Sequence, residues 1–245
     1  MSKKILLIII CILFSCLIYY YYQDCYYRLG DVIYRKATDN LFNRTLYSIK
    51  WKNTIADQYY KKKKKYQDYE TLYQIVKNKS KKVKIPDGIP DGKTLVIHLR
   101  IGDVIENEYL GSIDDLLEGK SDYKGSDGWY YLKDYKYFEN NIEKIKDKIN
   151  KIVIVGGYHC ANNPIRSKIY LEKLINFMQK KNYIIEQRID KYSSDEDFIY
   201  MSNSSYFLRS GGGYSKLANE MVKMNNKYNL IENYDDNYED RSSCK

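Results

Sequence analysis

The sequence predicts an α/β fold in which helices cover both faces of a parallel sheet. From residue 94 onward, short apolar segments alternate with helical segments of about 10 to 20 residues, a pattern typical of βαβ units. The composition is 44% hydrophobic and 30% charged with three prolines, which excludes disordered, collagen-like and disulfide-dense proteins. Two Pro-Asp-Gly turns at residues 86–92 separate this region from an upstream helical segment. We therefore expect a three-layer, Rossmann-like domain.

The first element is an apolar segment at residues 5–22, preceded by Lys3 and Lys4. As a helix it is about 27 Å long, enough for a membrane span. Lysines at one end and tyrosines at the other predict that residues 1–22 are the cytosolic tip and signal anchor of a single-pass type II membrane protein. A cleaved signal peptide and a lipoprotein signal ending at Cys16 are the alternatives. No A-x-A site follows the segment, and Phe14 is unusual before a lipidated cysteine.

Outside this segment the remaining cysteines are odd in number, so they form at most one disulfide: Cys25, Cys160 and Cys244. There is no C-x-x-C pair and there are two histidines, so we predict no structural zinc site. In a eukaryotic or viral host the body would face the Golgi or ER lumen. The sequons at Asn43, Asn78 and Asn203 would then make it a candidate glycoprotein.

Residues 23–90 form the next region. Residues 23–82 carry apolar side chains at helical spacing, such as Leu72, Tyr73 and Val76. We interpret the region as a stalk or a small helical subdomain. The lysines at residues 61–65 are better explained by a solvated helix face or loop than by contact with anionic lipid or nucleic acid.

Residues 91–245 contain the α/β elements. Residues 94–99 and 151–155 are apolar and rich in β-branched side chains, which predicts buried strands. Shorter runs predict strands at residues 183–189 and 206–209. Helical periodicity predicts the connecting helices at residues 129–149, 167–181, 195–203 and 216–228.

Parallel sheets bind ligands beyond the carboxyl ends of their strands, so those positions are candidate site residues. His98 and Arg100 are two residues apart at the end of the first strand and so lie on one side of it. The Arg100 guanidinium is suited to bind a phosphate through two hydrogen bonds, and Gly102 lets the backbone turn away. Gly156 and Gly157 end the second strand and would permit close approach of a ligand.

A third candidate segment precedes the last helix. It contains Ser210, Gly212, Gly213, Tyr214 and Ser215. Backbone N–H groups, hydroxyls and the helix dipole at such a start form an anion site. Together the three segments predict a diphosphate site for a nucleotide or nucleotide sugar. The alternative is that the glycines form a tight loop and His98 is a core residue.

Several functional classes lack their motifs. The sequence contains no Walker A, G-x-G-x-x-G, H-E-x-x-H or G-x-S-x-G pattern. ATPases, dinucleotide oxidoreductases, zinc proteases and α/β-hydrolases are therefore disfavoured.

Residues 98–103, His-Leu-Arg-Ile-Gly-Asp, resemble the H-x-R-R-G-D motif of the fucosyltransferase superfamily, especially the α1,2-fucosyltransferases. The α1,6- and protein O-fucosyltransferases are more distant. The order of later segments is also similar: a helix start at residues 129–132, a strand at 151–155 and a D-x-x-x-M segment at 197–201. A serine–glycine segment at 210–218 follows. The resemblance covers residues 94–219.

This resemblance implies that residues 91–245 are the nucleotide-sugar-binding domain of a GT-B glycosyltransferase. It implies GDP-fucose as donor, a glycan or protein hydroxyl as acceptor, inversion at the sugar carbon, and no metal or other cofactor. Arg100 would bind the β-phosphate and stabilise the departing GDP, and His98 would contact the nucleotide. Ser210, Tyr214 and Ser215 would line the phosphate and sugar pocket. Asp103 is our candidate general base, ahead of Glu106 and Glu108.

The sequence departs from the family pattern at named positions. Ile101 replaces the second arginine, and Arg209 is a candidate substitute. Gly156 and Gly157 stand where relatives often carry acidic residues that help to bind the nucleotide. Residues 23–90 are shorter than the usual acceptor domain, so this divergent, truncated segment is either a stalk or a reduced acceptor subdomain.

The leading hypothesis is therefore a membrane-anchored, fucosyltransferase-like glycosyltransferase. Its predicted partners are a nucleotide-sugar donor, a glycan or glycoprotein acceptor and a membrane through residues 5–22, with no nucleic acid. The alternatives are a glycosyltransferase that uses another nucleotide sugar, and a non-catalytic, membrane-tethered binding protein with a vestigial site.

Overall fold

A computed structural model describes residues 12–13, 29–34, 52–65, 67–85, 87–106, 111–120, 131–159, 161–225 and 227–229. The predicted anchor at residues 5–22 lies outside these ranges except for Ile12 and Leu13, and all of the cysteines lie outside them. None of the helices within these ranges has both the length and the hydrophobicity of a membrane span.

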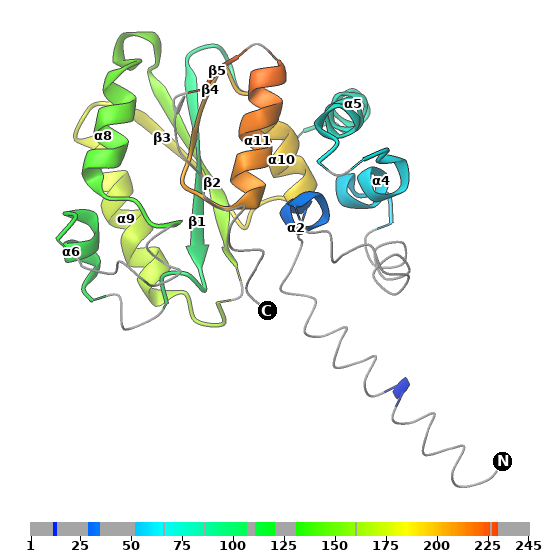
Figure 1. The fold of residues 1–245 in the computed structure, drawn as a ribbon. Helices are drawn as coiled ribbons and strands as arrows, with labels where there is room; N and C mark the ends of the chain where they lie inside the picture. The colour runs from blue at the N-terminus through cyan, green and yellow to red at the C-terminus, as the bar shows by residue number, and fades with distance from the viewer. Residues whose placement is uncertain are drawn as a thin grey trace, which may run out of the picture.

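A parallel sheet of five strands forms the centre of the fold, in the order β3-β2-β1-β4-β5 (Figure 1). All four strand pairs are parallel. The strands are β1 (Thr94–Gly102), β2 (Lys151–His159), β3 (Ile184–Ile189), β4 (Tyr206–Arg209) and β5 (Tyr228–Asn229). The predicted parallel α/β sheet is confirmed.

Helices cover both faces of the sheet, which gives the predicted three layers (Figure 1). On one face lie α6 (Ile113–Leu117), α8 (Tyr135–Glu143) and α9 (Ile165–Gln179). On the other lie α10 (Ser194–Ser202) and α11 (Gly213–Met224), together with α2 (Leu29–Tyr34), α4 (Ile55–Lys62) and α5 (Tyr69–Ser80). Apolar side chains fill a separate core cluster on each face.

The central strand β1 is apolar on both faces because helices cover both of them. Leu95, Ile97 and Leu99 pack toward α6, α8 and α9, whereas Val96 packs toward α10 and α11. Side chains alternate along a strand, so His98 and Arg100 lie on the same face as Val96. The sequence pattern therefore directs both candidate site residues toward the α10–α11 layer.

The helices α2, α4 and α5 share the core cluster of α10, α11 and Val96 of β1. Asp195 at the start of α10 accepts hydrogen bonds from the backbone N–H of Ile55 at 3.0 and 3.2 Å and pairs with Lys79. The predicted boundary at residues 90–91 thus separates two chain segments that contribute to one core.

Several predicted bounds need correction. Instead of one helix over residues 129–149, the structure has α8 and a short 3₁₀ turn at Lys146–Lys148, with residues 129–130 outside the described ranges. β2 does not end at Gly156 but continues to His159. The last helix begins at Gly213 and ends at Met224, and residues 228–229 form β5 instead of its last turn.

Candidate functional site

The candidate site lies where the strand order changes direction. From β1 the chain proceeds to β2 and β3 on one side, then crosses to β4 on the other side of β1. Such a switch point opens a crevice beyond the carboxyl ends of the two strands, the usual ligand site of an open α/β sheet. Here these ends belong to β1 and β4, which carry His98, Arg100 and Arg209.

The structure brings Ser210 together with β1. The Ser210 hydroxyl accepts a hydrogen bond from the backbone N–H of Arg100 at 2.9 Å, and the Ser210 N–H donates to the His98 carbonyl at 3.1 Å. Arg209, the candidate substitute for the second arginine, is buried and paired in register with His98. The motif segment and the serine–glycine segment thus meet, as the sequence predicts.

Helix α11 begins directly after these contacts. Gly211 and Gly212 have φ values of 149° and 84°, the latter in the left-handed region that favours glycine. Gly212 is the N-cap residue and has no side chain to cap this helix, whereas the Ser193 side chain caps α10. Among the described residues no side chain accepts a hydrogen bond from the first N–H groups of α11, which is the arrangement that an anion site at a helix start requires.

Arg100 is half-buried beside this helix start. Its guanidinium pairs with Asp103 at 2.8 Å and donates to the Ile101 carbonyl at 3.0 Å. It also lies 5.7 Å from the ring centroid of Tyr131, and the same ring would be 3.0 Å from a Cβ on Gly212. Tyr131 therefore connects the guanidinium to the glycine turn.

Two further residues at the site were not predicted. Tyr131 belongs to the Trp-Tyr-Tyr segment at residues 129–131, which resembles a helix start of the fucosyltransferase superfamily. That resemblance was the one feature of the sequence that could have indicated Tyr131. Gly30 of α2 lies so near α11 that an added Cβ would be 3.1 Å from the Gly213 carbonyl carbon and the Tyr214 nitrogen. No local motif marks Gly30, because its role depends on packing between distant segments.

His98 is buried, with 6% of its surface exposed. Burial, with a smaller contribution from the charge of Arg100, lowers the pKa of His98 from about 6.5 to about 3. Its ring centroid lies 5.5 Å from that of Tyr214, and its Nδ1 finds no hydrogen-bond partner among the described residues. His98 is therefore neutral at pH 7, and its Nδ1 is a buried polar atom to which the described residues offer no hydrogen bond.

The buried histidine predicts a pH dependence of stability. Between pH 6.5 and 3 the unfolded chain binds a proton at residue 98 that the folded chain does not, so the free energy of unfolding falls as the pH is lowered. We expect a slope of about 1.4 kcal/mol per pH unit from this residue. Urea unfolding of wild type and His98→Gln between pH 4 and 7 measures it, and parallel pH profiles would contradict the assignment.

Tyr214 and Ser215 lie in the first turn of α11. The Tyr214 hydroxyl donates to the Ser194 carbonyl, its ring packs 5.3 Å from that of Phe198, and burial raises its pKa well above 10. Ser215 is fully buried, and its hydroxyl has no hydrogen-bond partner in the described part of the chain. Contact of either residue with a donor sugar stays a prediction.

The glycines at the ends of β1 and β2 are accounted for by packing. A Cβ on Gly102, which has a φ of 95°, would lie 2.3 Å from the His159 carbonyl oxygen. A Cβ on Gly156 would lie 2.6 Å from the Leu99 carbonyl oxygen, and one on Gly157 would lie 2.3 Å from a carboxylate oxygen of Asp190. At all three positions, protein atoms already fill the space that a side chain would need, which explains the glycines. Ligand contact at these positions stays a prediction.

The candidate bases are in different environments. Asp103 is 38% exposed and pairs with Arg100, so it lies within the site. Glu106 accepts hydrogen bonds from the backbone N–H groups of Arg166 and Ser167 at 3.1 and 2.8 Å and from the Ser167 hydroxyl at 2.6 Å. Glu106 thus caps α9 and is unsuited to act as a base, while Glu108 lies outside the described residues.

The capping role of Glu106 gives a second prediction. Glu106→Ala leaves three donors at the start of α9 without this partner, so we expect the free energy of unfolding to fall by about 1–3 kcal/mol. Glu143→Ala, which removes only an exposed pair with Lys146, is the matched control and should change it by less than about 0.5 kcal/mol. Equal effects in urea unfolding would argue against the cap.

In the part of the chain that the structure describes, no three His, Cys, Asp or Glu side chains are grouped to hold a metal ion. The polar groups of the site are the Arg100 guanidinium with its Asp103 partner, backbone N–H groups, hydroxyls and a neutral imidazole. This set suits a phosphorylated ligand.

No protein-family model matches the chain, and a search of curated proteins finds no match. The chain is similar to solved structures of POFUT1. POFUT1 in complex with GDP aligns over 65% of this chain and 49% of its own, with 10% identity and a TM-score of 0.38. A complex of POFUT1 with GDP-fucose aligns over 65% of this chain and 48% of its own, with 9% identity and a TM-score of 0.38. The apo form aligns over 64% of this chain and 48% of its own, with 12% identity and a TM-score of 0.36. The chain spans about half the length of these structures.

Proposed function

We propose that this protein is a fucosyltransferase-like glycosyltransferase of GT-B type that transfers fucose from GDP-fucose to a hydroxyl of a glycan or protein. The observation that carries the proposal is the meeting of Arg100 with Ser210, and through Tyr131 with the glycine turn before α11, at the switch point of the sheet. The resemblance of residues 98–103 to the H-x-R-R-G-D motif of the fucosyltransferase superfamily is the reason for proposing GDP-fucose as the donor.

The residues at the site suit a departing diphosphate. The Arg100 guanidinium and the first N–H groups of α11 supply positive charge where the leaving group gains negative charge, without a metal ion. His98, being neutral, contributes Nδ1 as a hydrogen-bonding atom for the nucleotide. Ser210 fixes the backbone of Arg100 and so positions the guanidinium.

In the proposed reaction the acceptor hydroxyl attacks the sugar carbon from the side opposite GDP, with inversion. Asp103 would take the proton of that hydroxyl. The bond between the sugar carbon and the β-phosphate oxygen breaks, and GDP leaves with the electron pair. Alignment of acceptor and donor supplies much of the rate enhancement for such a displacement.

We further propose that residues 5–22 anchor the enzyme in the Golgi or ER membrane with its α/β domain in the lumen. The lysines before that segment and the tyrosines after it support this orientation. Asn78, within one of the sequons, is exposed on α5 and accessible to glycosylation.

Two other functions are supported by particular observations. Gly156 and Gly157 stand where relatives often carry acidic residues that help to bind the nucleotide, which favours a different base and hence another nucleotide sugar. Asp103 already neutralises Arg100, which favours a vestigial site in a non-catalytic binding protein.

Thermal unfolding of the full-length chain with nucleotides tests the proposal. Ligands that bind the native state raise the melting temperature. We expect GDP and GDP-fucose to raise it by a few degrees, in EDTA as well as without it, while UDP and CMP do not. A rise with UDP alone would favour the second donor class, and no rise with any nucleotide would favour the vestigial site.

A further inference from the structure

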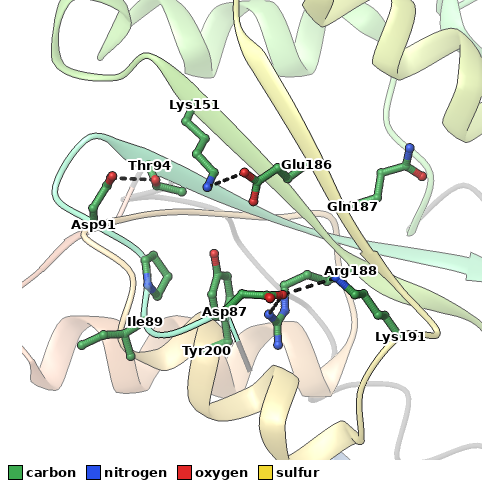
Figure 2. A pocket seen from close by; sticks show the side chains of 11 residues that line it. Asp87, Ile89, Asp91, Thr94, Lys151, Glu186, Gln187, Arg188, Lys191 and Tyr200 are labelled. Atoms are coloured by element: carbon green, nitrogen blue, oxygen red, sulfur yellow. Dashed lines mark hydrogen bonds and ion pairs between the residues drawn. The ribbon is translucent and has the colours of Figure 1, made fainter. Parts of the chain in front are cut away.

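A polar pocket lies beside the starts of β1 and β2, whereas the candidate donor site lies beyond the end of β1; Figure 2 shows the pocket. Its volume is about 550 Å³, within the usual range of small-molecule sites. It lies where the chain enters β1 and β2, between the turn at residues 87–91, the edge strand β3 and Tyr200 of α10. We infer that this pocket binds a neutral sugar unit, independently of the donor site.

The floor of the pocket is the open edge of the sheet. Lys151 pairs in register with Thr94, and Val153 pairs with Glu186. Because side chains alternate along each strand, Thr94, Lys151 and Glu186 lie on the same face, the one that carries α10. β3 is the edge strand, so this part of the face stays open beside the helix.

The wall on one side is rigid. Arg188 is buried, and its guanidinium lies 3.9 Å from the ring centroid of Tyr192 and 4.1 Å from that of Tyr200. It also pairs with Asp197 at 3.2 Å and with Asp87 at 3.4 Å. These contacts fix Tyr200 before a ligand arrives, which lowers the entropy cost of binding.

The charges around the pocket balance locally. Three carboxylates and three cations line it: Asp87, Asp91, Glu186, Lys151, Arg188 and Lys191. Lys151 lies 2.7 Å from Glu186, and Lys191 lies 3.4 Å from Asp87. An ionic ligand would have to compete with one member of such a pair, so the pocket favours a neutral ligand.

The pocket still offers hydrogen bonds. Asp91 accepts its hydrogen bonds from the Lys93 N–H and the Thr94 hydroxyl through Oδ1, which leaves Oδ2. Lys151 has more donors, and Glu186 more acceptor sites, than their single ion pair uses. The Tyr200 hydroxyl points into the space between these groups (Figure 2), and burial raises its pKa to about 12, so it remains protonated.

A sugar matches this arrangement. Each of its hydroxyls both donates and accepts, so neighbouring hydroxyls can bond a carboxylate and an ammonium group together. Ile89, with 61% of its surface exposed, supplies apolar surface for the C–H face of the ring. A carboxylate only accepts hydrogen bonds and an ammonium group only donates them, so neither uses both kinds of polar group by itself.

Saturation-transfer NMR on the full-length chain, in buffer without sugar-based detergent, tests this inference. The probes are the methyl glycosides of glucose, galactose and N-acetylglucosamine, with glucose 6-phosphate and glucosamine as charged comparators. Excess GDP is present to occupy the donor site. We expect at least one neutral glycoside to bind with a Kd on the order of millimolar, more tightly than its charged counterparts.

Two variants and one matched control locate the binding. Tyr200→Phe keeps the ring against Arg188 and removes the hydroxyl, and Lys151→Gln removes the ammonium; each should weaken binding about 3- to 10-fold. Lys181→Gln breaks a similar pair, 2.6 Å from Glu139 on the other face, and should leave binding unchanged. Binding that is unaffected by both pocket variants, stronger for a charged sugar, or absent for every neutral glycoside overturns the inference. Loss of GDP binding alone does not affect it.

Discussion

Replacing Gly102 with alanine is expected to lower the free energy of unfolding by about 3–5 kcal/mol. The new Cβ would lie 2.3 Å from the carbonyl oxygen and 2.5 Å from the backbone nitrogen of His159, so β1 and β2 would have to separate. The φ of 95° adds strain, because L side chains rarely adopt this conformation.

The surroundings leave little room for relaxation. The Gly102 N–H donates to the Ser167 hydroxyl at 3.0 Å, and its carbonyl accepts from the N–H groups of Ile105 and Glu106 at 3.0 and 3.2 Å. A shift of this residue therefore disturbs β1, β2 and the start of α9 together.

Gly92→Ala is the matched control for this substitution. Among the described residues, no neighbouring atom lies within 4 Å of a Cβ placed there, and its φ lies outside the left-handed region, so stability should be nearly unchanged. Urea unfolding of the two variants compares them directly. Equal midpoints would show that β1 and β2 tolerate a side chain at Gly102.

The sheet was predictable because burial and hydrophobicity coincide in β1 and β2. Strands that are apolar on both faces are stable only in the middle of a sheet whose two faces are covered by helices. The end of β2 was not predictable in the same way. Two consecutive glycines normally indicate a strand end, yet Gly156 and Gly157 continue the strand. They are glycines because the Leu99 carbonyl and the Asp190 carboxylate leave no space for a side chain at these positions.

The single helix expected at residues 129–149 shows a second limit. Helical periodicity continues through Asp134, which the structure shows as the N-cap of α8, its carboxylate accepting from the Tyr137 N–H at 2.7 Å. The cap was present in the sequence, but the apolar spacing around it concealed the break.

Within the site, the predictable part was local. The spacing of His98 and Arg100 and the glycines before α11 indicate an anion site from a few residues each. The contacts of Tyr131 with Gly212 and of Gly30 with Gly213 join segments far apart in the chain. Only the folded chain brings those segments together, so no motif within one segment could reveal them.

Replacing Arg100 with alanine is expected to abolish the rise in melting temperature caused by GDP and to lower fucosyl transfer at least about 100-fold. The guanidinium is the main positive charge that the proposed site offers to the leaving diphosphate, and removal of such a group typically has an effect of this size. Arg100→Lys keeps the charge but loses the planar fork, so we expect partial recovery.

Asp103→Asn separates binding from chemistry at the same place. It removes the carboxylate 2.8 Å from the Arg100 guanidinium, so GDP should bind as tightly as in wild type or more tightly. If Asp103 is the base, turnover still falls about 100-fold or more, because an amide cannot accept the acceptor's proton. Full turnover in Asp103→Asn would remove Asp103 from the reaction and leave its pairing with Arg100 as its role. Retained GDP binding in Arg100→Ala would instead show that the start of α11 binds the phosphate without β1.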